Sequence, residues 1–409
     1  MIDIVQSIRD FNSGRDPEKL TIKYAKMRTS PYVFLRGTCH LFYEQLIANS
    51  LPADSPLAWI CGDLHLENFG SYKANNRLVY FDINDFDEAV LAPVTWDLVR
   101  VLTSVFAAGA SLRVDAKQAL LLCKEFLQAY SKALESGKSS WVDRDNASGL
   151  VRSLLDGLRD RSRVEHLDKY TVRGKKRRSI RCDGARALKA SDKEFARASK
   201  LVDAFAATQK HRDREFFEVV DVAHRIAGVG SLGVERYIVL VTGKSSPDEN
   251  YLLDVKQTFA SSLEAKIQGV TQPVWPSEAS RVVTLQDRMQ AATTAFAGSV
   301  ATAKGKRSYV VRALQPSADR VALDDSEVTF EQVRNVISQL GHLVAWAHLR
   351  GSGMQGSAPA DALMAFGATR KRWQEALLSA ARVCAAQTVN DWNAYCTAYD
   401  AGAFPVKTD

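Results

Sequence analysis

A short stretch between an apolar run and a glycine gathers side chains that could do chemistry. Residues 60–70 read ICGDLHLENFG, and Asp63, His65 and Asn68 lie close together within it. A carboxylate, an imidazole and an amide at such spacing suit a metal site, a nuclease-like site or a phosphoryl-transfer loop. The stretch alone leaves these three chemistries open, so the surrounding chain must decide between them.

A second carboxylate narrows the choice. Asp63 and Asn68 are five residues apart, and Asp85 follows Asn68 by 17 residues, across a predicted strand. Mg²⁺ prefers oxygen ligands and usually takes only one or two from the protein, with water and phosphate completing its shell. A separate carboxylate can then orient an attacking hydroxyl. These are the residue types that a magnesium-dependent phosphoryl-transfer site needs.

Apolar elements must position these residues. The run LAWIC before Asp63 and the alternating RLVYFDI (77–83) predict strands, and TWDLVRVLTSVFAAGASL predicts a helix. DAKQALLLCKEFLQAYSKALESG predicts a second helix, N-capped near Asp115 and ended by Gly137. SPYVFLRGT (30–38) opens with Ser-Pro and is expected to be extended.

The pattern changes after a charged, poorly periodic segment at 138–200. Residues 219–257 are rich in predicted strands and contain one glycine cluster, and 280–298 predicts a helix. SYVVRALQP (308–316) predicts a strand, and the chain from Thr329 onward predicts helices. The order is mixed, then helical, then β-rich, then helical again.

Composition sets broad limits. The 409 residues are 46% hydrophobic and 25% charged, which is ordinary for a soluble protein of one to three domains. We expect no membrane span, no secretory signal and a cytoplasmic location. Six cysteines lack CxxC spacing, which favours reduced thiols over a disulfide framework or a zinc site; they are Cys39, Cys61, Cys123, Cys182, Cys384 and Cys396.

The net charge of +7 suits a phosphate-bearing ligand as well as nucleic acid. Much of the excess lies in VRGKKRRSIR (172–181), which is either a solvated, mobile loop or a patch that attracts an anionic substrate. No aromatic interleaving or nucleic-acid motif accompanies it, so nucleic acid is not the expected partner.

The stretch GDLHLEN resembles the catalytic loop of kinase-like phosphotransferases, most closely that of the small-molecule branch, which includes aminoglycoside phosphotransferases and choline kinases. NDFDEAVLAPVTWDL (84–98) resembles the next motif of that branch. The resemblance implies that Asp63 accepts or orients the substrate hydroxyl and that Asn68 and Asp85 hold Mg²⁺. Asp82 competes with Asp85, because its spacing from Asn68 matches the small-molecule enzymes slightly better. Asp97 is expected to hold the loop by hydrogen bonds.

A nucleotide-binding block follows later in the chain. GVGSLG (228–233) resembles the glycine-rich loop of kinases, which implies that Gly228, Gly230, Ser231 and Gly233 cover the phosphates of ATP. YLLDVKQ places Lys256 on the next strand, as in the V-A-I-K motif. The partner of Lys256 is open between Glu264, eight residues on, and Gln286 or Asp287 on the later helix.

The motifs that resemble those of kinases are therefore present, but in a rotated order along the chain. We expect an α+β, two-lobed, protein-kinase-like fold that is circularly permuted, with the catalytic-loop segment before the β-rich nucleotide lobe. Residues 1–215 would form the catalytic segment with the charged insert at about 138–200, residues 216–320 the nucleotide lobe, and residues 321–409 the completing helices.

The whole pattern also resembles a bacterial family known only as a domain of unknown function, number twenty-two fifty-two. It carries SPxxFxRG, GDLHLENFG, NDFDE, GVGSxG and an LxxAHxR helix. The kinase resemblance implies an ATP- and Mg²⁺-dependent phosphotransferase that acts on a hydroxyl, with a small molecule favoured over a protein as the acceptor. The alternatives are transfer of AMP on the same scaffold, and a nucleotide-binding pseudokinase that serves as an interaction module.

Other polar residues have more ordinary interpretations. Arg36 could bind phosphate or form a buried ion pair. His65 is expected to fill and hydrogen-bond the loop. His342 and His348 are six residues apart on a predicted helix, which does not suit a helical metal pair, so both are expected to be structural.

Overall fold

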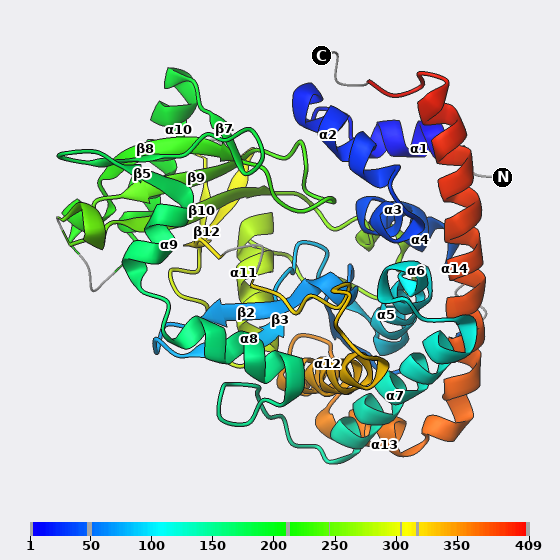
Figure 1. The fold of residues 1–409 in the computed structure, drawn as a ribbon. Helices are drawn as coiled ribbons and strands as arrows, with labels where there is room; N and C mark the ends of the chain where they lie inside the picture. Colours follow the sequence, from blue (N-terminus) through cyan, green and yellow to red (C-terminus); the bar gives the residue numbers. More distant parts are fainter. Residues whose placement is uncertain are drawn as a thin grey trace.

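The computed structural model describes residues 3–46, 51–209, 213–244, 246–302, 305–315 and 319–405. Helices and antiparallel strands are mixed, which is compatible with the expected α+β class. Figure 1 shows the strands gathered on one side and most of the long helices on the other. We call these the sheet part and the helical part.

The sheet part is built on six antiparallel strands in the order β11-β12-β10-β9-β8-β7. Strand β8 leads into the glycine-rich loop and β9 leads out of it, so the loop joins two neighbouring antiparallel strands. The bounds are β7 (Ala187–Lys189), β8 (Val219–Arg225), β9 (Arg236–Val241), β10 (Tyr251–Thr258), β11 (Gly298–Ala301) and β12 (Ser308–Ala313).

One face of this sheet carries an apolar core. Alternate residues of β9 and β10, such as Tyr237, Val239, Leu253 and Val255, pack with Phe205 of α10. Because side chains alternate across a strand, the residues between them point to the other face. The short elements around the sheet are α9 (Arg163–Tyr170), β5 (Thr171–Arg173), β6 (Arg178–Ile180), α10 (Asp192–Ala206), η3 (Arg214–Phe217), η4 (Pro247–Glu249) and η5 (Glu264–Lys266).

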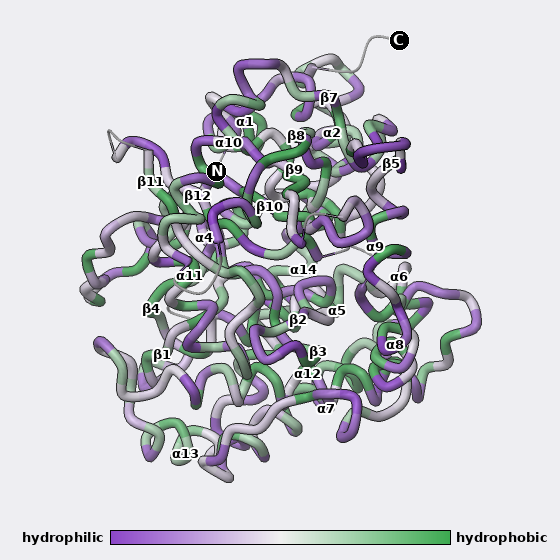
Figure 2. Tube along the Cα trace, turned by 90° about the vertical axis from the view of Figure 1, so that its left-hand side faces the viewer, coloured by the Kyte–Doolittle hydropathy of each residue, from purple (hydrophilic) through white to green (hydrophobic). Residues whose placement is uncertain are grey.

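The helical part buries the larger core. Long helices pack around α5, whose buried stripe includes Leu98, Val101, Leu102 and Val105. In Figure 2 hydrophobic residues run through the inner elements, while hydrophilic residues gather at the outer turns. The helices are α1 (Ile4–Phe11), α2 (Pro17–Met27), α3 (Pro31–Gly37), α4 (Cys39–Gln45), α5 (Val94–Ala107), α6 (Gly109–Leu112), α7 (Ala116–Glu135), α8 (Gly149–Arg159), α11 (Glu278–Met289), α12 (Phe330–Arg350), α13 (Ala360–Ala368) and α14 (Arg370–Asp400).

Two of these helices begin at capping residues, at the positions that the sequence predicts. The Asp115 side chain accepts from the Gln118 backbone N–H and Gln118 bonds back, which forms a capping box at α7. Thr329 and Gln332 form the same motif at α12. Gly137, with φ of 65°, lies just beyond α7 in the left-handed conformation that glycine adopts at little cost.

Two short two-stranded sheets carry the loop region. Strand β1 (Leu57–Ile60) pairs with β4 (Val90–Pro93), and β2 (Phe69–Lys73) pairs with β3 (Val79–Ile83). Between β1 and β2 the chain makes a single turn of 3-10 helix, η2 (Leu66–Asn68). The residues of GDLHLEN therefore lie in a tight connection anchored by strands at both ends.

Three local predictions need correction. Residues 31–37 are not extended but form α3, because the Ser30 hydroxyl caps the helix and Pro31 suits its first turn. The helix predicted over 280–298 ends at Met289, and Gly298 begins β11. The basic cluster 172–181 is not a loop throughout: it forms the β5–β6 hairpin, in which the buried Arg178 pairs with Asp168 and Asp248.

The charged segment contributes directly to the sheet part. Its strand β7 pairs with β8, and α10 follows it onto the apolar face of the sheet. Within the described ranges, none of the helices combines the length and the apolar character that a bilayer crossing requires.

Candidate functional site

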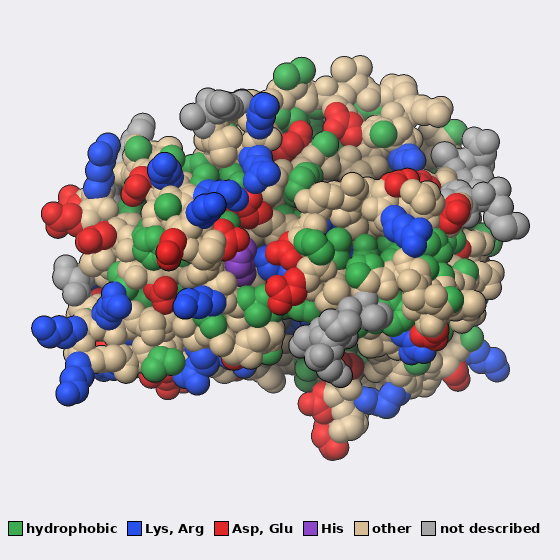
Figure 3. Space-filling view, turned by 90° about the horizontal axis from the view of Figure 1, so that it is seen from above, with side chains coloured by type: hydrophobic (Ala, Val, Ile, Leu, Met, Phe, Trp, Pro, Cys, Tyr) green, Lys and Arg blue, Asp and Glu red, His purple; other side chains and the backbone are tan. Residues whose placement is uncertain are grey.

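A cavity of about 260 Å³ lies between the sheet part and the helical part. The GDLHLEN loop, the loop after β3 and the glycine-rich loop all line it. Figure 3 shows the molecule hollowed between its two parts, with acidic and basic side chains gathered there. Sequence blocks separated by more than 140 residues, at Asp63 and Gly228, therefore meet at one site.

The GDLHLEN loop is held from α5. The two carboxylate oxygens of the buried Asp97 accept from the backbone N–H groups of Cys61 (2.8 Å) and Gly62 (2.9 Å). This confirms the sequence prediction that Asp97 holds the loop. Gly62 has φ of 83°, and a Cβ there would lie 2.4 Å from the Glu88 carbonyl oxygen, so the turn requires glycine.

His348 lies behind this contact. Its Nε2 is 3.4 Å from Asp97, and its Nδ1 is 3.0 Å from the hydroxyl of Tyr130. The His348 ring is fully buried, and its contact with Asp97 helps to hold the loop. This agrees with the structural role expected from its place on the helix.

Asp63 points into the cavity beside a buried arginine. Arg100 Nη2 lies 2.6 Å from Asp63 Oδ1 and also donates to the Leu35 carbonyl. Burial raises the pKa of Asp63, while Arg100 acts in the opposite direction. Sequence reasoning missed Arg100. It is one of only two charged residues, with Asp97, in an otherwise apolar helix, and that is the signal that could have revealed it.

Asn68 and His65 shape the same loop. Asn68 lines the cavity, and its side-chain amide donates to the Asp63 carbonyl. His65 Nδ1 accepts from the Glu67 backbone N–H at 3.2 Å, and burial holds its pKa well below its ordinary value. His65 is therefore a neutral group that hydrogen-bonds the loop, as predicted.

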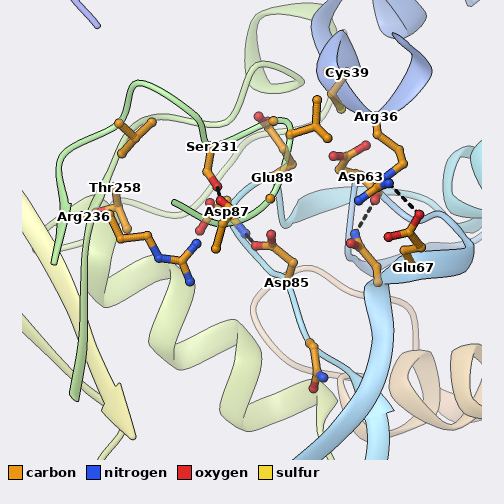
Figure 4. Close-up of a pocket in the computed structure, with 18 of the residues that line it drawn as sticks. Arg36, Cys39, Asp63, Glu67, Asp85, Asp87, Glu88, Ser231, Arg236 and Thr258 are labelled. Carbon is orange, nitrogen blue, oxygen red and sulfur yellow. Dashed lines mark hydrogen bonds and ion pairs between the residues drawn. The ribbon is translucent and has the colours of Figure 1, made fainter. Parts of the chain in front are cut away.

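The loop after β3 meets Lys256. The Lys256 ammonium is 3.7 Å from Asp85 Oδ1 and forms a closer ion pair with Asp87. The lysine side chain is 5% exposed, whereas the Asp85 side chain is 45% exposed and lines the cavity. Sequence reasoning did not identify Asp87. Figure 4 shows Asp85 and Asp87 close together, with Arg236 pointing toward them from the sheet.

The candidate partners of Lys256 lie elsewhere. Glu264 is exposed in η5, Gln286 bonds Gln290 and Thr294, and Asp287 accepts from Thr293. The structure thus brings Lys256 to the two aspartates of the FDINDFDEA segment.

Asp82 and Asp85 occupy different environments. Asp82 is buried and accepts from the Ala291 backbone N–H (3.0 Å) and from Arg350 (3.3 Å). Asp85 faces the cavity. Partial burial acts to raise the pKa of Asp85, but Lys256, Arg312 and Arg236 together hold it below its ordinary value. An ionised carboxylate on the cavity wall is the more suitable of the two for a cation.

The glycine-rich loop forms the roof of the cavity. Gly228, Gly230 and Ser231 line it, and both Gly228 and Gly233 have positive φ, at 73° and 85°. The loop is fixed from the N-terminal helices: Arg15 donates to the Gly230 carbonyl at 2.7 Å. The Asp16 backbone N–H donates to the Gly233 carbonyl at 2.9 Å.

Arg36 forms an ion pair. Its Nη1 is 2.6 Å from Glu67 Oε1, and Arg320 bonds the other oxygen of the same carboxylate. Its Nε is buried and has no hydrogen-bond partner among the described residues. Of the two roles left open by the sequence, the structure shows the ion pair.

Among the described residues, no group of three His, Cys, Asp or Glu side chains is placed to hold a metal ion. Asn68 and Asp85 both present oxygen-bearing side chains to the cavity. That donor set fits a Mg²⁺ ion that shares its shell with phosphate and water.

These features define an α+β protein with a charged cavity between a glycine-loop sheet and a helical part. The chain belongs to the family described as "Uncharacterized protein conserved in bacteria (DUF2252)", whose model matches residues 15–398. No match was found among curated proteins or among solved structures.

Proposed function

We propose that this protein is an ATP- and Mg²⁺-dependent phosphotransferase that acts on a hydroxyl group, and that its fold is a circularly permuted relative of the kinase fold. The contact between Lys256 and Asp85 carries the proposal. It joins β10, the second strand after the glycine-rich loop, to the segment after the GDLHLEN loop, and these are the two blocks that phosphoryl transfer requires together.

Each residue has a role within the cavity. Asn68 and Asp85 would hold Mg²⁺, which neutralises charge on the phosphates when bound. Asp63 accepts or orients the acceptor hydroxyl, and Arg100 fixes the direction of its carboxylate. Lys256 and the backbone of residues 228–233 hold the phosphates. Catalysis would come from positioning and charge neutralisation, with little covalent chemistry by the protein.

The acceptor class follows only from the resemblance of GDLHLEN, which favours a small molecule. The mass of the product separates the proposed reaction from its nearest alternative, because transfer adds either one phosphate or one AMP. A pseudokinase would bind nucleotide without forming either product.

Calorimetric titration with ATP, with and without Mg²⁺, tests the proposal. We expect Mg²⁺-dependent binding to the wild type and binding at least tenfold weaker to Lys256→Ala, since hydrogen bonds to charged groups contribute about 1.5–3 kcal/mol. Lys266→Ala is the matched control: Lys256 pairs with Asp85 and Asp87, which line the cavity, whereas Lys266 contacts Glu44, which does not, at 3.5 Å. A folded wild type that binds no ATP would contradict the proposal.

A further inference from the structure

The face of the sheet that looks into the cavity carries three arginines around one carboxylate. Arg225 ends β8, Arg236 begins β9 and Arg312 lies on β12, while Asp254 lies between them on β10. Asp254 is directly opposite Arg312 in the β10–β12 register. Opposed residues share a face of the sheet, which explains why these four side chains meet.

The contacts are short and buried. Arg236 binds Asp254 through two parallel hydrogen bonds of 2.7 and 2.6 Å, and Arg225 Nη1 lies 2.8 Å from Asp254 Oδ2. Arg312 Nε is 3.5 Å from the same oxygen. Asp254 is 1% exposed, and Arg225 and Arg236 are 8% and 7% exposed. Among the described residues, the other donors of Arg225 and Arg312 bond backbone carbonyls, those of Gln315 and Asn84.

One carboxylate does not balance three guanidinium groups. The cluster of Arg225, Arg236, Arg312 and Asp254 carries a formal charge of +2 in a buried setting. Burial acts to raise the pKa of Asp254, but the arginines hold it well below its ordinary value. Burial, together with the charges of Arg236 and Arg312, lowers the pKa of Arg225 to about 10, although Asp254 acts in the opposite direction.

The surplus charge lies next to another cation. Lys256 is directly opposite Arg236 in the β9–β10 register, and its ion pairs with Asp85 and Asp87 offset part of the repulsion between these like charges. Buried charges destabilise a fold unless they are compensated. A fold that retains this arrangement gains an electropositive wall, which is a suitable surface for an anion.

The wall faces the cavity at the base of the glycine-rich loop. All three arginines line the cavity, and Arg225 and Arg236 are the strand residues that flank the loop. In Figure 4 Arg236 extends from the sheet toward Asp85 and Asp87. An anion bound at the wall would thus lie between the glycine-rich loop and Asp85.

The sequence around Lys256 departs from the kinase pattern at this point. In V-A-I-K the residue two before the lysine is a small alanine. Here that residue is Asp254, and it gathers the arginines over the surface of the sheet. A flat aromatic base would meet charged groups on this wall rather than the apolar surface that ligand pockets usually offer.

We propose that Arg225, Arg236 and Arg312 form a subsite for a polyphosphate group, and that the sheet holds the phosphates of the ligand and not its base. This deepens the proposed function, on which it rests for the identity of the donor. Guanidinium groups bind phosphate oxygens with paired, directional hydrogen bonds, which suits a chain of phosphates better than a single carboxylate.

Calorimetry with inorganic tripolyphosphate in the absence of Mg²⁺ tests this directly. We expect the wild type to bind tripolyphosphate, and Arg312→Gln to bind it 10- to 100-fold more weakly. Arg312 is the most exposed member of the cluster, so its loss disturbs folding least. Arg307→Gln is the matched control, because Arg307 is exposed, pairs with Glu235 and does not line this cavity.

The wild type alone supplies a second measurement. Tripolyphosphate should compete with ATP, whereas adenosine, which has the base and no phosphate, should bind at least 100-fold more weakly than ATP. Adenosine binding as tight as that of ATP, or unchanged tripolyphosphate binding in Arg312→Gln, would overturn the subsite. Tripolyphosphate binding lost in Arg312→Gln, in a protein that transfers neither phosphate nor AMP, would support the subsite and contradict only the proposed function.

Discussion

The guanidinium of Arg100 lies 2.6 Å from the carboxylate of Asp63, and this pair joins helix α5 to the GDLHLEN loop. Arg100 is fully buried, whereas the Asp63 side chain is 22% exposed and faces the cavity. The same helix holds the start of the loop through Asp97. One rigid element therefore fixes both the path of the loop and the direction of its acid.

Asp63→Asn should reduce transfer by about 10²–10⁴-fold, the usual contribution of a general base. The amide has nearly the same shape but accepts no proton. Product formation measured by mass spectrometry, once an acceptor is found, provides the readout. The control is Asp160→Asn, because Asp160 is 92% exposed. Full activity in Asp63→Asn would remove Asp63 from the mechanism.

Asp97→Asn should lower the free energy of unfolding by about 1–3 kcal/mol, because one of two buried backbone N–H groups loses its acceptor. Urea denaturation measures the change. Asp145→Asn, at a side chain 81% exposed, should leave stability unaltered. Equal stability of wild type and Asp97→Asn would show that the loop is held by other contacts.

Asp254→Asn should have opposite effects on stability and on anion binding. Removal of the carboxylate takes away the one counter-charge that all three guanidinium groups contact, which should destabilise the fold by about 3–5 kcal/mol. The same change makes the wall more positive, so tripolyphosphate should bind more tightly to the folded variant. Denaturation and calorimetry on one preparation test both effects, and weaker binding would contradict the expectation.

Stability should fall as the pH is lowered from about 6.5. Burial lowers the pKa of His40 to about 3 and that of His166 to about 4. An unfolded histidine titrates near 6.5, so between pH 6.5 and 4 the unfolded chain binds protons that the folded chain excludes. Each of these two histidines then lowers the free energy of unfolding by about 1.4 kcal/mol for each unit by which the pH is lowered.

Urea denaturation at pH 7, 6 and 5 measures this slope. His40→Phe keeps a ring that can stack on Phe11, as His40 does at 3.9 Å, but cannot take up a proton. It should reduce the slope by about 1.4 kcal/mol per pH unit. An unchanged slope would place the acid sensitivity in other groups.

Periodicity and caps were enough to predict most of the elements. The strands 77–83 and 219–257 and the helices after Asp115 and Thr329 lie near their predicted places, because their apolar patterns are strong. Helix α3 was missed because its seven residues are too few to show a helical period. The Ser30 cap was the available signal.

The candidate site was predictable only in part. Asp63, Asn68, Asp85 and the glycine-rich loop stood out because several residues formed a spaced motif. The three arginines of the sheet did not stand out, because each is a single charge in a different strand; they are Arg225, Arg236 and Arg312. Only the pairing of β8, β9, β10 and β12 brings them together. Asp87 was hidden for the same reason, since its partner Lys256 is 169 residues away.

The attachment of the glycine-rich loop to the N-terminal helices has a kinetic consequence. Arg15 and Lys23 both donate to the carbonyl of Gly230, and the Asp16 backbone holds that of Gly233. A ligand that needs the loop to lift must first break these bonds. Entry of the ligand is then limited by the rate at which the loop opens, and the contacts with α2 and with the α1–α2 connection set that rate. The observed association rate should therefore reach a plateau as the ligand concentration rises.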